Sequence, residues 1–158
     1  MKSFACAALV ALASASKKDF PKDSSFHAGC HVTAQFDGVQ CSDLYALMDN
    51  EVRNWSSSTS PAGGSYSLKE EASDDYIWST RLTLNKKYTD DQLFEFTNNS
   101  SGCTVAGKSR SESMSYLDNS VNFCNLWNVF NGTSDKFTYS VGKCSVTTDD
   151  PATTCARY

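Results

Sequence analysis

Histidine is scarce in this chain: His27 and His31, on either side of Cys30, are its two histidines. A four-residue spacing suits a metal site on a helix, but this segment shows no helical pattern and no third ligand stands nearby. A serine triad would need one of the two beside a nucleophile that nothing in the sequence marks. The sequence therefore predicts no metal, no cofactor and no catalytic triad.

Long apolar runs are also absent, apart from one at the start. Residues 4–12 are apolar, Lys2 precedes them, and Ala13-Ser14-Ala15 follows as a small-residue cleavage pattern. Nine apolar residues are too few to span a bilayer, and the three parts together are typical of a secretory signal peptide. We expect residues 1–15 to be removed, the chain to be secreted, and no membrane span to remain.

Clusters of positive charge are the third absence. Without residues 1–15 the chain has 13 basic and 18 acidic side chains, and the basic ones are scattered along the sequence. Duplex binding depends on clustered Lys and Arg that release counterions from phosphates. The composition therefore argues against a nucleic-acid partner.

Cysteine is plentiful, but no pair has the C-x-x-C spacing of a zinc or redox site. Outside the predicted signal peptide the chain keeps six: Cys30, Cys41, Cys103, Cys124, Cys144 and Cys155. An even number in an exported chain predicts three disulfides. Fifteen pairings are possible; if the last strand lies antiparallel beside residues 103–114, the favoured ones are Cys30–Cys41, Cys103–Cys144 and Cys124–Cys155.

Four glycosylation sequons accompany the cysteines. Their acceptors are Asn54, Asn98, Asn99 and Asn131, and all four fall at predicted helix ends or loops. A glycan there would stay in water and leave the packing undisturbed. We therefore expect a glycoprotein.

The periodicity predicts a single small disulfide-stapled α+β domain over residues 30–158, after a flexible arm over residues 16–29. Alternation predicts strands at 31–37, 66–69, 76–84, 94–96, 103–114 and 136–146, and 3.6-residue spacing predicts helices at 42–55 and 118–132. The order is β-α-β-β-β-β-α-β. We expect a curved antiparallel sheet packed on the N-terminal amphipathic helix, with the second, shorter helix beside it.

Two patterns inside these elements are unusual. One face of residues 103–114 carries only small side chains, which leaves room for a large neighbour such as Trp78, a sharp bend or a cavity. Asparagine recurs at every third position of the second helix, which favours a solvated face over a recognition ladder. The recurring residues are Asn122, Asn125, Asn128 and Asn131.

These patterns favour a secreted binding or interaction protein without catalytic activity. A pocket between helix and sheet would take a small apolar or sugar-like ligand, or the surface a protein partner. Its expected lining is Met48, Trp55, Tyr76, Trp78, Phe94 and Phe96. The alternatives are a structural or surface-coat glycoprotein and a small hydrolase acting through Glu95 and Glu112, whereas adjacent pairs such as Asp90-Asp91 are typical of solvated turns.

Overall fold

A computed structural model describes residues 16–115, 118–134 and 136–158, so the predicted signal peptide lies outside the described residues. It is a small α+β domain with a six-stranded antiparallel sheet in the order β2-β3-β4-β5-β1-β6. In chain order the elements are β1 (Gly29–Asp37), α1 (Cys41–Asn54), β2 (Ser65–Ala72), β3 (Tyr76–Leu82), β4 (Thr89–Asn99), β5 (Gly102–Ser111), α2 (Val121–Thr133), β6 (Thr138–Cys144) and α3 (Pro151–Cys155).

The six strands and the two long helices follow one another as the sequence predicts, but the structure contains three further elements that the sequence did not predict. These are α3 and two short 3-10 turns, Lys17–Asp19 and Pro61–Gly63. The expectation that Asp90-Asp91 forms a solvated turn is wrong, because β4 already begins at Thr89. Asp90 and Asp91 favour turns in isolation, but here both are buried and hydrogen-bonded.

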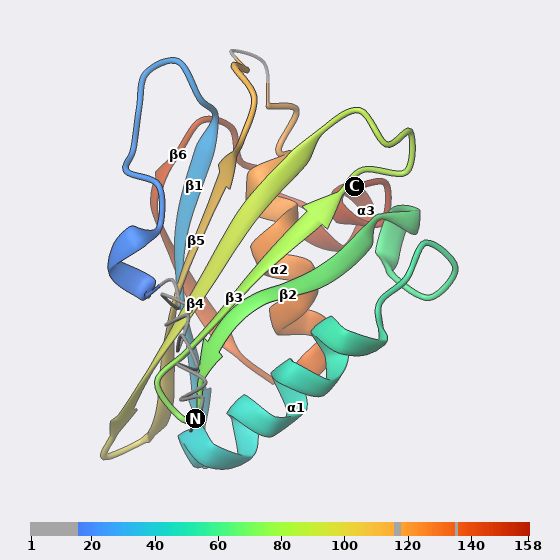
Figure 1. Ribbon diagram of the computed structural model, residues 1–158. Helices are drawn as coiled ribbons and strands as arrows, with labels where there is room; N and C mark the ends of the chain where they lie inside the picture. The colour runs from blue at the N-terminus through green and yellow to red at the C-terminus, as the bar shows by residue number, and fades with distance from the viewer. Residues whose placement is uncertain (1–15, 116–117, 135) are drawn as a thin grey trace, which may run out of the picture.

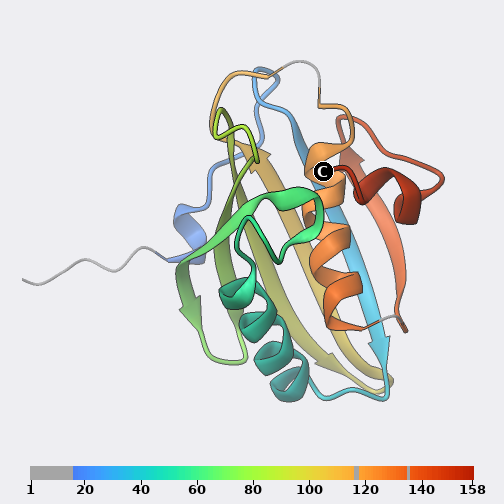
Figure 2. The ribbon, with the colours of Figure 1, turned by 90° about the vertical axis from the view of Figure 1, so that its right-hand side faces the viewer.

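Two helices, and not the first alone, cover one face of the sheet. Figures 1 and 2 show α1 and α2 side by side across this face, which we call the inner face. Phe123, Leu126 and Phe130 of α2 are fully buried against it. Helix α2 is therefore as much a part of the core as the amphipathic α1.

The inner face of the sheet is divided into an apolar half and a polar half. The first apolar row across β3, β4 and β5 consists of Ile77, Phe94 and Gly107. The two polar rows consist of Ser79, Gln92 and Ser109, and of Arg81, Asp90 and Ser111. All six polar side chains are buried, so this end of the core needs hydrogen-bonding partners from the helix above it.

The row of small residues in β5 admits an aromatic ring, which is Phe130 and not Trp78. A Cβ atom on Gly107 would lie 2.9 Å from Phe130 Cζ and 3.3 Å from the Val32 carbonyl oxygen. Phe130 also packs edge to face on Phe94, with ring centroids 5.7 Å apart. The absence of a side chain at position 107 is what lets α2 approach the sheet.

Substitution of Gly107 by Val is therefore expected to lower the free energy of unfolding by about 2 kcal/mol, because the added side chain would overlap the fully buried Phe130 and crowd the Val32 backbone. Gly142→Val on the edge strand β6 is the matched control, because its nearest contact, the His31 carbonyl oxygen, is 3.5 Å away. Urea denaturation of the two variants measures the difference. Equal midpoints would contradict the close packing of α2.

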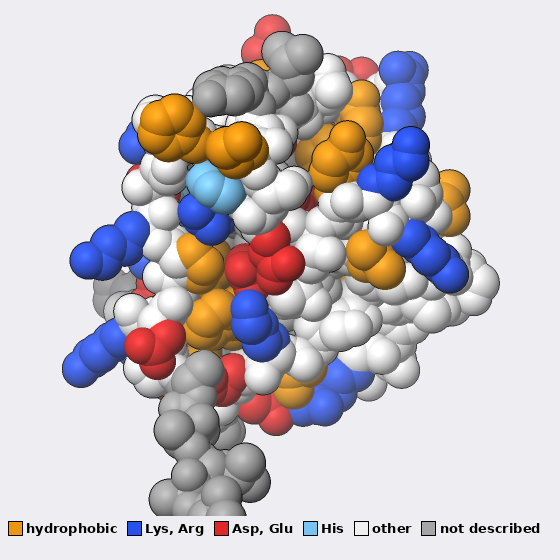
Figure 3. All heavy atoms as spheres, turned by 45° about the horizontal axis from the view of Figure 1, so that its top comes forward, with side chains coloured by type: hydrophobic (Ala, Val, Ile, Leu, Met, Phe, Trp, Pro, Cys, Tyr) orange, Lys and Arg blue, Asp and Glu red, His pale blue; other side chains and the backbone are white. Residues whose placement is uncertain are grey.

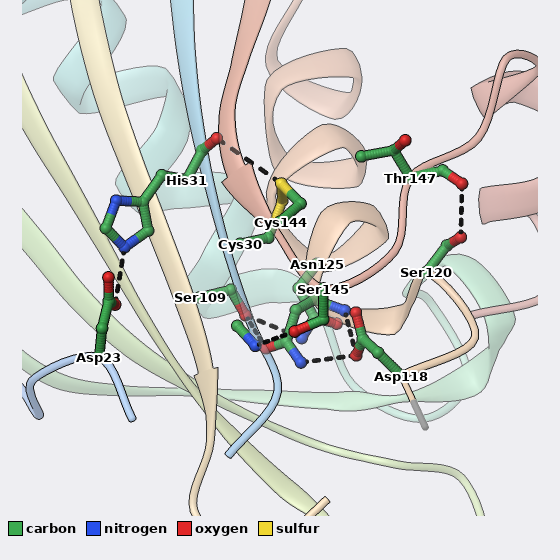
Figure 4. The surroundings of a disulfide bond; sticks show 12 residues. Asp23, Cys30, His31, Ser109, Asp118, Ser120, Asn125, Cys144, Ser145 and Thr147 are labelled. Carbon is green, nitrogen blue, oxygen red and sulfur yellow. Dashed lines mark hydrogen bonds and ion pairs between the residues drawn. A yellow bond between two sulfur atoms is a disulfide. The ribbon is translucent and has the colours of Figure 1, made fainter. Parts of the chain in front are cut away.

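Three disulfides link the domain, and two of the expected pairings are wrong. The bonds are Cys30–Cys144, Cys41–Cys103 and Cys124–Cys155. The last is as predicted. The other two differ because β6 pairs with β1 and not with β5, which places Cys144 directly opposite Cys30, as Figure 4 shows.

The outer face of the sheet is covered in part by residues 16–28. Phe20 packs edge to face on Trp78 with ring centroids 5.4 Å apart, and Trp78 lies with Tyr76 and Leu93 in a second small apolar cluster. Lys17 forms an ion pair with Asp75 in the turn after β2. The predicted arm is thus seen in contact with the sheet, and its flexibility stays a prediction.

Basic residues that are scattered in the sequence meet beneath this arm. Lys17, Lys18, Lys22, His31 and Lys108 line a groove between the arm and the outer face. Three of them contact carboxylates: Lys108 Nζ lies 2.7 Å from Glu95, His31 Nε2 lies 3.0 Å from Asp23, and Lys17 pairs with Asp75. The absence of a nucleic-acid partner stays a prediction. None of the helices in the described ranges has the length and apolar content to cross a bilayer.

Candidate functional site

The candidate site is the polar end of the core, defined here as the two polar rows of the sheet with the α2 residues above them. Asn122 and Asn125 in the first half of α2 lie over these rows and bond to them. Leu126 and Phe130, farther along the same helix, cover the apolar half at Gly107. Because 3.6 residues make a turn, positions 122, 125 and 126 all face the sheet. The same helix therefore supplies amides to one half of the core and hydrocarbon to the other.

These groups form one hydrogen-bonded network. Asn125 Nδ2 donates to Asp90 Oδ2 (2.9 Å) and to Ser109 Oγ (3.1 Å). Ser111 Oγ donates to Asp90 Oδ1 (2.7 Å), and Asn122 Nδ2 donates to Ser111 Oγ (3.1 Å). Four side chains, two from β5 and two from α2, thus form one network with the buried carboxylate of Asp90.

Asp118 joins the network from the chain before α2. Its Oδ1 accepts from Asn122 Nδ2 (2.7 Å) and from the Asn122 backbone N–H (3.2 Å), so it also satisfies a free donor at the helix start. Figure 4 shows Asp118 at this position, near Ser109 and Asn125. Asp90 and Asp118 are therefore linked through Ser111 and Asn122.

The expectation of a solvated asparagine face is wrong. Asn122 and Asn125 are fully buried, and Asn128 is buried with its amide donating to the Cys155 and Tyr158 carbonyl oxygens. Asn131 alone of the four is exposed. The row is a structural ladder whose partners come from β4, β5 and the C-terminal segment.

A cavity of about 480 Å³ lies at this end of the domain. It is bounded by the turn between β3 and β4, the chain that follows β5 and the start of α2, which lie at one end of the sheet in Figure 1. Its lining residues are Thr83, Tyr88, Asp90, Ser111, Met114, Ser115, Asp118, Asn119 and Val121. This volume is within the range of small-molecule binding sites.

The mouth of the cavity carries exposed apolar side chains. Tyr88 is 51% and Met114 70% exposed although both line the cavity, and Leu84 stands exposed in the same turn as Tyr88. Figure 3 shows hydrophobic side chains gathered on this end of the molecule. Exposed apolar side chains around a concave site are typical of binding surfaces.

The floor of the cavity contains an unused acceptor. Asp118 is only 3% exposed, and its Oδ2 has no hydrogen-bond partner among the described residues. The same is true of Asn125 Oδ1, Arg81 Nε and Nη1 and Gln92 Nε2, deeper in the polar end of the core. Buried polar atoms without a partner are uncommon, and such a cluster indicates a place for water or a ligand.

Both carboxyl groups of the site hold their protons more strongly than free aspartate. Burial raises the pKa of Asp90, against the hydrogen bonds from Asn125 and Ser111 and the attraction of Arg81. Burial also raises the pKa of Asp118; the bonds from Asn122 lower it, and the charge of Asp90 raises it again. The site is therefore poorly compensated when both groups are charged.

A pH dependence follows from this shift. Because the folded pKa of Asp118 exceeds that of the unfolded chain, about 3.9, its contribution to stability is complete below that pH and is lost as pH rises through the folded value. Asp118→Asn should therefore gain stability relative to wild type as pH rises above about 4. Urea denaturation at a series of pH values measures this.

Asp150→Asn is the opposite control. Hydrogen bonds from Thr153 lower the pKa of Asp150, so its contribution is present above the unfolded pKa and is lost as pH falls. This variant should lose stability relative to wild type at neutral pH and approach it in acid. The same slope in both variants would contradict the burial of Asp118.

The six residues predicted to line a pocket do not come together. Met48, Trp55, Phe94 and Phe96 are buried in the main core between the helices and the sheet. Tyr76 and Trp78 lie on the opposite face, in the cluster beneath Phe20. Alternation along β3 and β4 separates them, and their role in this structure is packing.

The two glutamates proposed for hydrolysis also lie apart. Glu95 contacts Lys108 on the outer face, whereas the Glu112 carboxylate lies 3.9 Å from Lys69, which pairs with Asp91. Asp91 and Glu95 are four residues apart on β4, or about 13 Å. The structure instead brings Asp90 and Asp118 together, and no spacing in the sequence marks that pair.

The four sequon asparagines, Asn54, Asn98, Asn99 and Asn131, are all exposed. Asn98 and Asn99 lie at the end of β4 and not in a loop as predicted, because the strand continues to the turn at Gly102. Their use for glycosylation stays a prediction.

The described residues contain no group of three His, Cys, Asp or Glu side chains arranged to hold a metal ion. No family model and no curated protein matches the chain. The function is therefore argued from the cavity itself.

Proposed function

We propose that this chain is a secreted, N-glycosylated binding protein, and that its ligand occupies the cavity over Asp90 and Asp118. Three disulfides in a small domain support an oxidising, extracellular location. A cavity of this size supports binding over a purely structural role.

The single observation that carries the proposal is the arrangement around Asp118. A buried carboxylate oxygen without a partner lies in a cavity whose mouth carries exposed Tyr88 and Met114. Burying a polar atom without a hydrogen bond costs stability, and such a cost is retained where the group has a function. The site offers a hydrogen-bond acceptor and apolar contact to one ligand.

A fragment screen by NMR tests this proposal. Amide shifts caused by bound fragments should cluster in residues 83–90, 111–115 and 118–121. Val121→Trp, which fills the cavity from the first residue of α2, should abolish them, whereas Val141→Trp on exposed β6 should not. Fragments that bind elsewhere, or equally to both variants, would overturn the proposal.

The same pair of carboxyl groups supports a second candidate, hydrolysis. Glycoside cleavage uses two carboxyl groups in one cleft, a proton donor with a raised pKa and an ionised partner. Asp90 and Asp118 both line the cavity, burial raises the pKa of each, and the charge of Arg81 favours the ionised form of Asp90. Under this candidate wild type turns over aryl glycosides and Asp90→Asn loses at least about a hundredfold of that rate. Wild type without turnover on such a panel would remove the candidate and leave the binding function.

A further inference from the structure

The charge around the cavity identifies the class of ligand. None of the nine described lining residues is basic. Asp90 has Arg81 opposite it in the neighbouring strand, and this positive charge favours its ionised form. Asp118 has no such partner: the described groups that act on it are the Asn122 amide and the negative charge of Asp90. A positive charge is missing beside Asp118 Oδ2.

The mouth of the cavity adds a preference for an apolar or aromatic body. Tyr88 presents an aromatic ring, and a cation near such a ring is stabilised by the negative charge of its face. Met114 presents a thioether, which packs well against aromatic rings. A neutral sugar would use the acceptor but would leave the charge of Asp118 uncompensated.

We propose that the cavity binds an organic amine, with its ammonium group at Asp118 Oδ2 and its apolar body against Tyr88 and Met114. This inference rests on the proposed binding function and specifies its ligand. An ammonium ion carries three donors, so it can satisfy Oδ2 and balance the charge in one contact. The burial that raises the pKa of both carboxyl groups is then offset when the amine binds.

Calorimetric titration with three matched probes tests the amine class. The probes are 2-phenylethylamine, neutral 2-phenylethanol and anionic phenylacetate, which share one ring and differ in charge. We expect the amine to bind at least about tenfold more tightly than the alcohol, and phenylacetate not to bind. Equal binding of amine and alcohol would overturn the inference.

Variants locate the contact. Asp118→Asn keeps the size of the side chain and an acceptor for Asn122, and it should weaken the amine at least about tenfold while changing the alcohol little. Asp149→Asn, an exposed substitution outside the cavity, should leave both affinities unchanged. An unchanged amine affinity in Asp118→Asn would contradict the assignment.

Substitutions that change the charge of an exposed residue at the mouth of the cavity test the inference without disturbing the folded core. Met114 is 70% exposed, so Met114→Glu and Met114→Lys should both fold. Both variants lose the thioether contact, so the two are compared with each other. Met114→Glu should bind the amine at least about threefold more tightly than Met114→Lys, and equal affinities would contradict the inference. If neutral fragments occupy the cavity and amines do not, the amine class fails and the binding function stands. If no fragment of any class enters, both fail.

Discussion

Removal of the Cys41–Cys103 bond by a double substitution to alanine is expected to lower the free energy of unfolding by about 4 kcal/mol. This bond closes a sequence separation of 62 residues and joins the start of α1 to the start of β5. Without this bond the unfolded chain gains the conformational entropy that loop closure had removed, so the unfolded state becomes more stable relative to the folded state. Denaturation of the oxidised double variant measures the loss.

The Cys124 and Cys155 double variant is the comparison, because its separation is only 31 residues. Chain entropy predicts a loss smaller by about 0.6 kcal/mol. A larger loss at Cys124 and Cys155 than at Cys41 and Cys103 would show that native strain or packing, and not loop length, dominates.

The connectivity itself is tested by a tryptic digest without reduction. Cleavage after Lys and Arg leaves Cys30 and Cys41 together in residues 23–53, and Cys144 and Cys155 together in residues 144–157. The observed bonds then join four peptides in one complex, residues 23–53, 88–108, 111–136 and 144–157. The pairing favoured from the sequence would release residues 23–53 alone.

Asn125→Leu is expected to cost about 2 kcal/mol of folding stability near neutral pH. The substitution removes the donors that hold Asp90 Oδ2 and Ser109 Oγ, both of which are buried. A buried carboxylate that loses a hydrogen bond bears the full desolvation cost of that oxygen. Thermal or urea denaturation of protein made without glycans measures the change.

Asn131→Leu is the matched control on the same helix. Asn131 belongs to the same row at three-residue spacing but is exposed, so its substitution should change stability by no more than about 0.5 kcal/mol. Similar costs at positions 125 and 131 would contradict the buried ladder.

The alternation of residues and the 3.6-residue spacing predicted the strands and the two long helices as far as β6, but not α3. These patterns depend only on neighbouring residues. A strand with one buried face shows its two-residue period within a few positions. The start of β4 was not predictable in this way. Asp90 and Asp91 are turn formers by themselves, and they enter a strand only because Asn125, Ser111 and Trp78 supply donors from distant positions.

The order of strands in the sheet is also nonlocal. Nothing in the sequence of β6 distinguishes β1 from β5 as its neighbour, and the choice of neighbour decided two of the three disulfides. The candidate site was missed for the same reason. Asp118 precedes α2 and Asp90 is the second residue of β4, and their proximity depends on the way α2 crosses the sheet.

The gap left by the small residues of β5 is the nearest signal to the site that the sequence contains. The small side chains of Ser109 and Ser111 leave space on the inner face of β5. The sequence predicted that a large side chain or a cavity would fill such a space, and the structure contains both. Gly107 accommodates Phe130, and Ser111 lines the cavity. The identity of the facing residues required the fold.

Native mass spectrometry of the protein from its own source tests directly whether the cavity over Asp90 and Asp118 holds a ligand. We expect a mass in excess of that of the glycosylated, disulfide-bonded protein. This excess should disappear on denaturation and be absent from Val121→Trp made in the same cells. Identical native and denatured masses, or a ligand that Val121→Trp retains, would contradict the proposal.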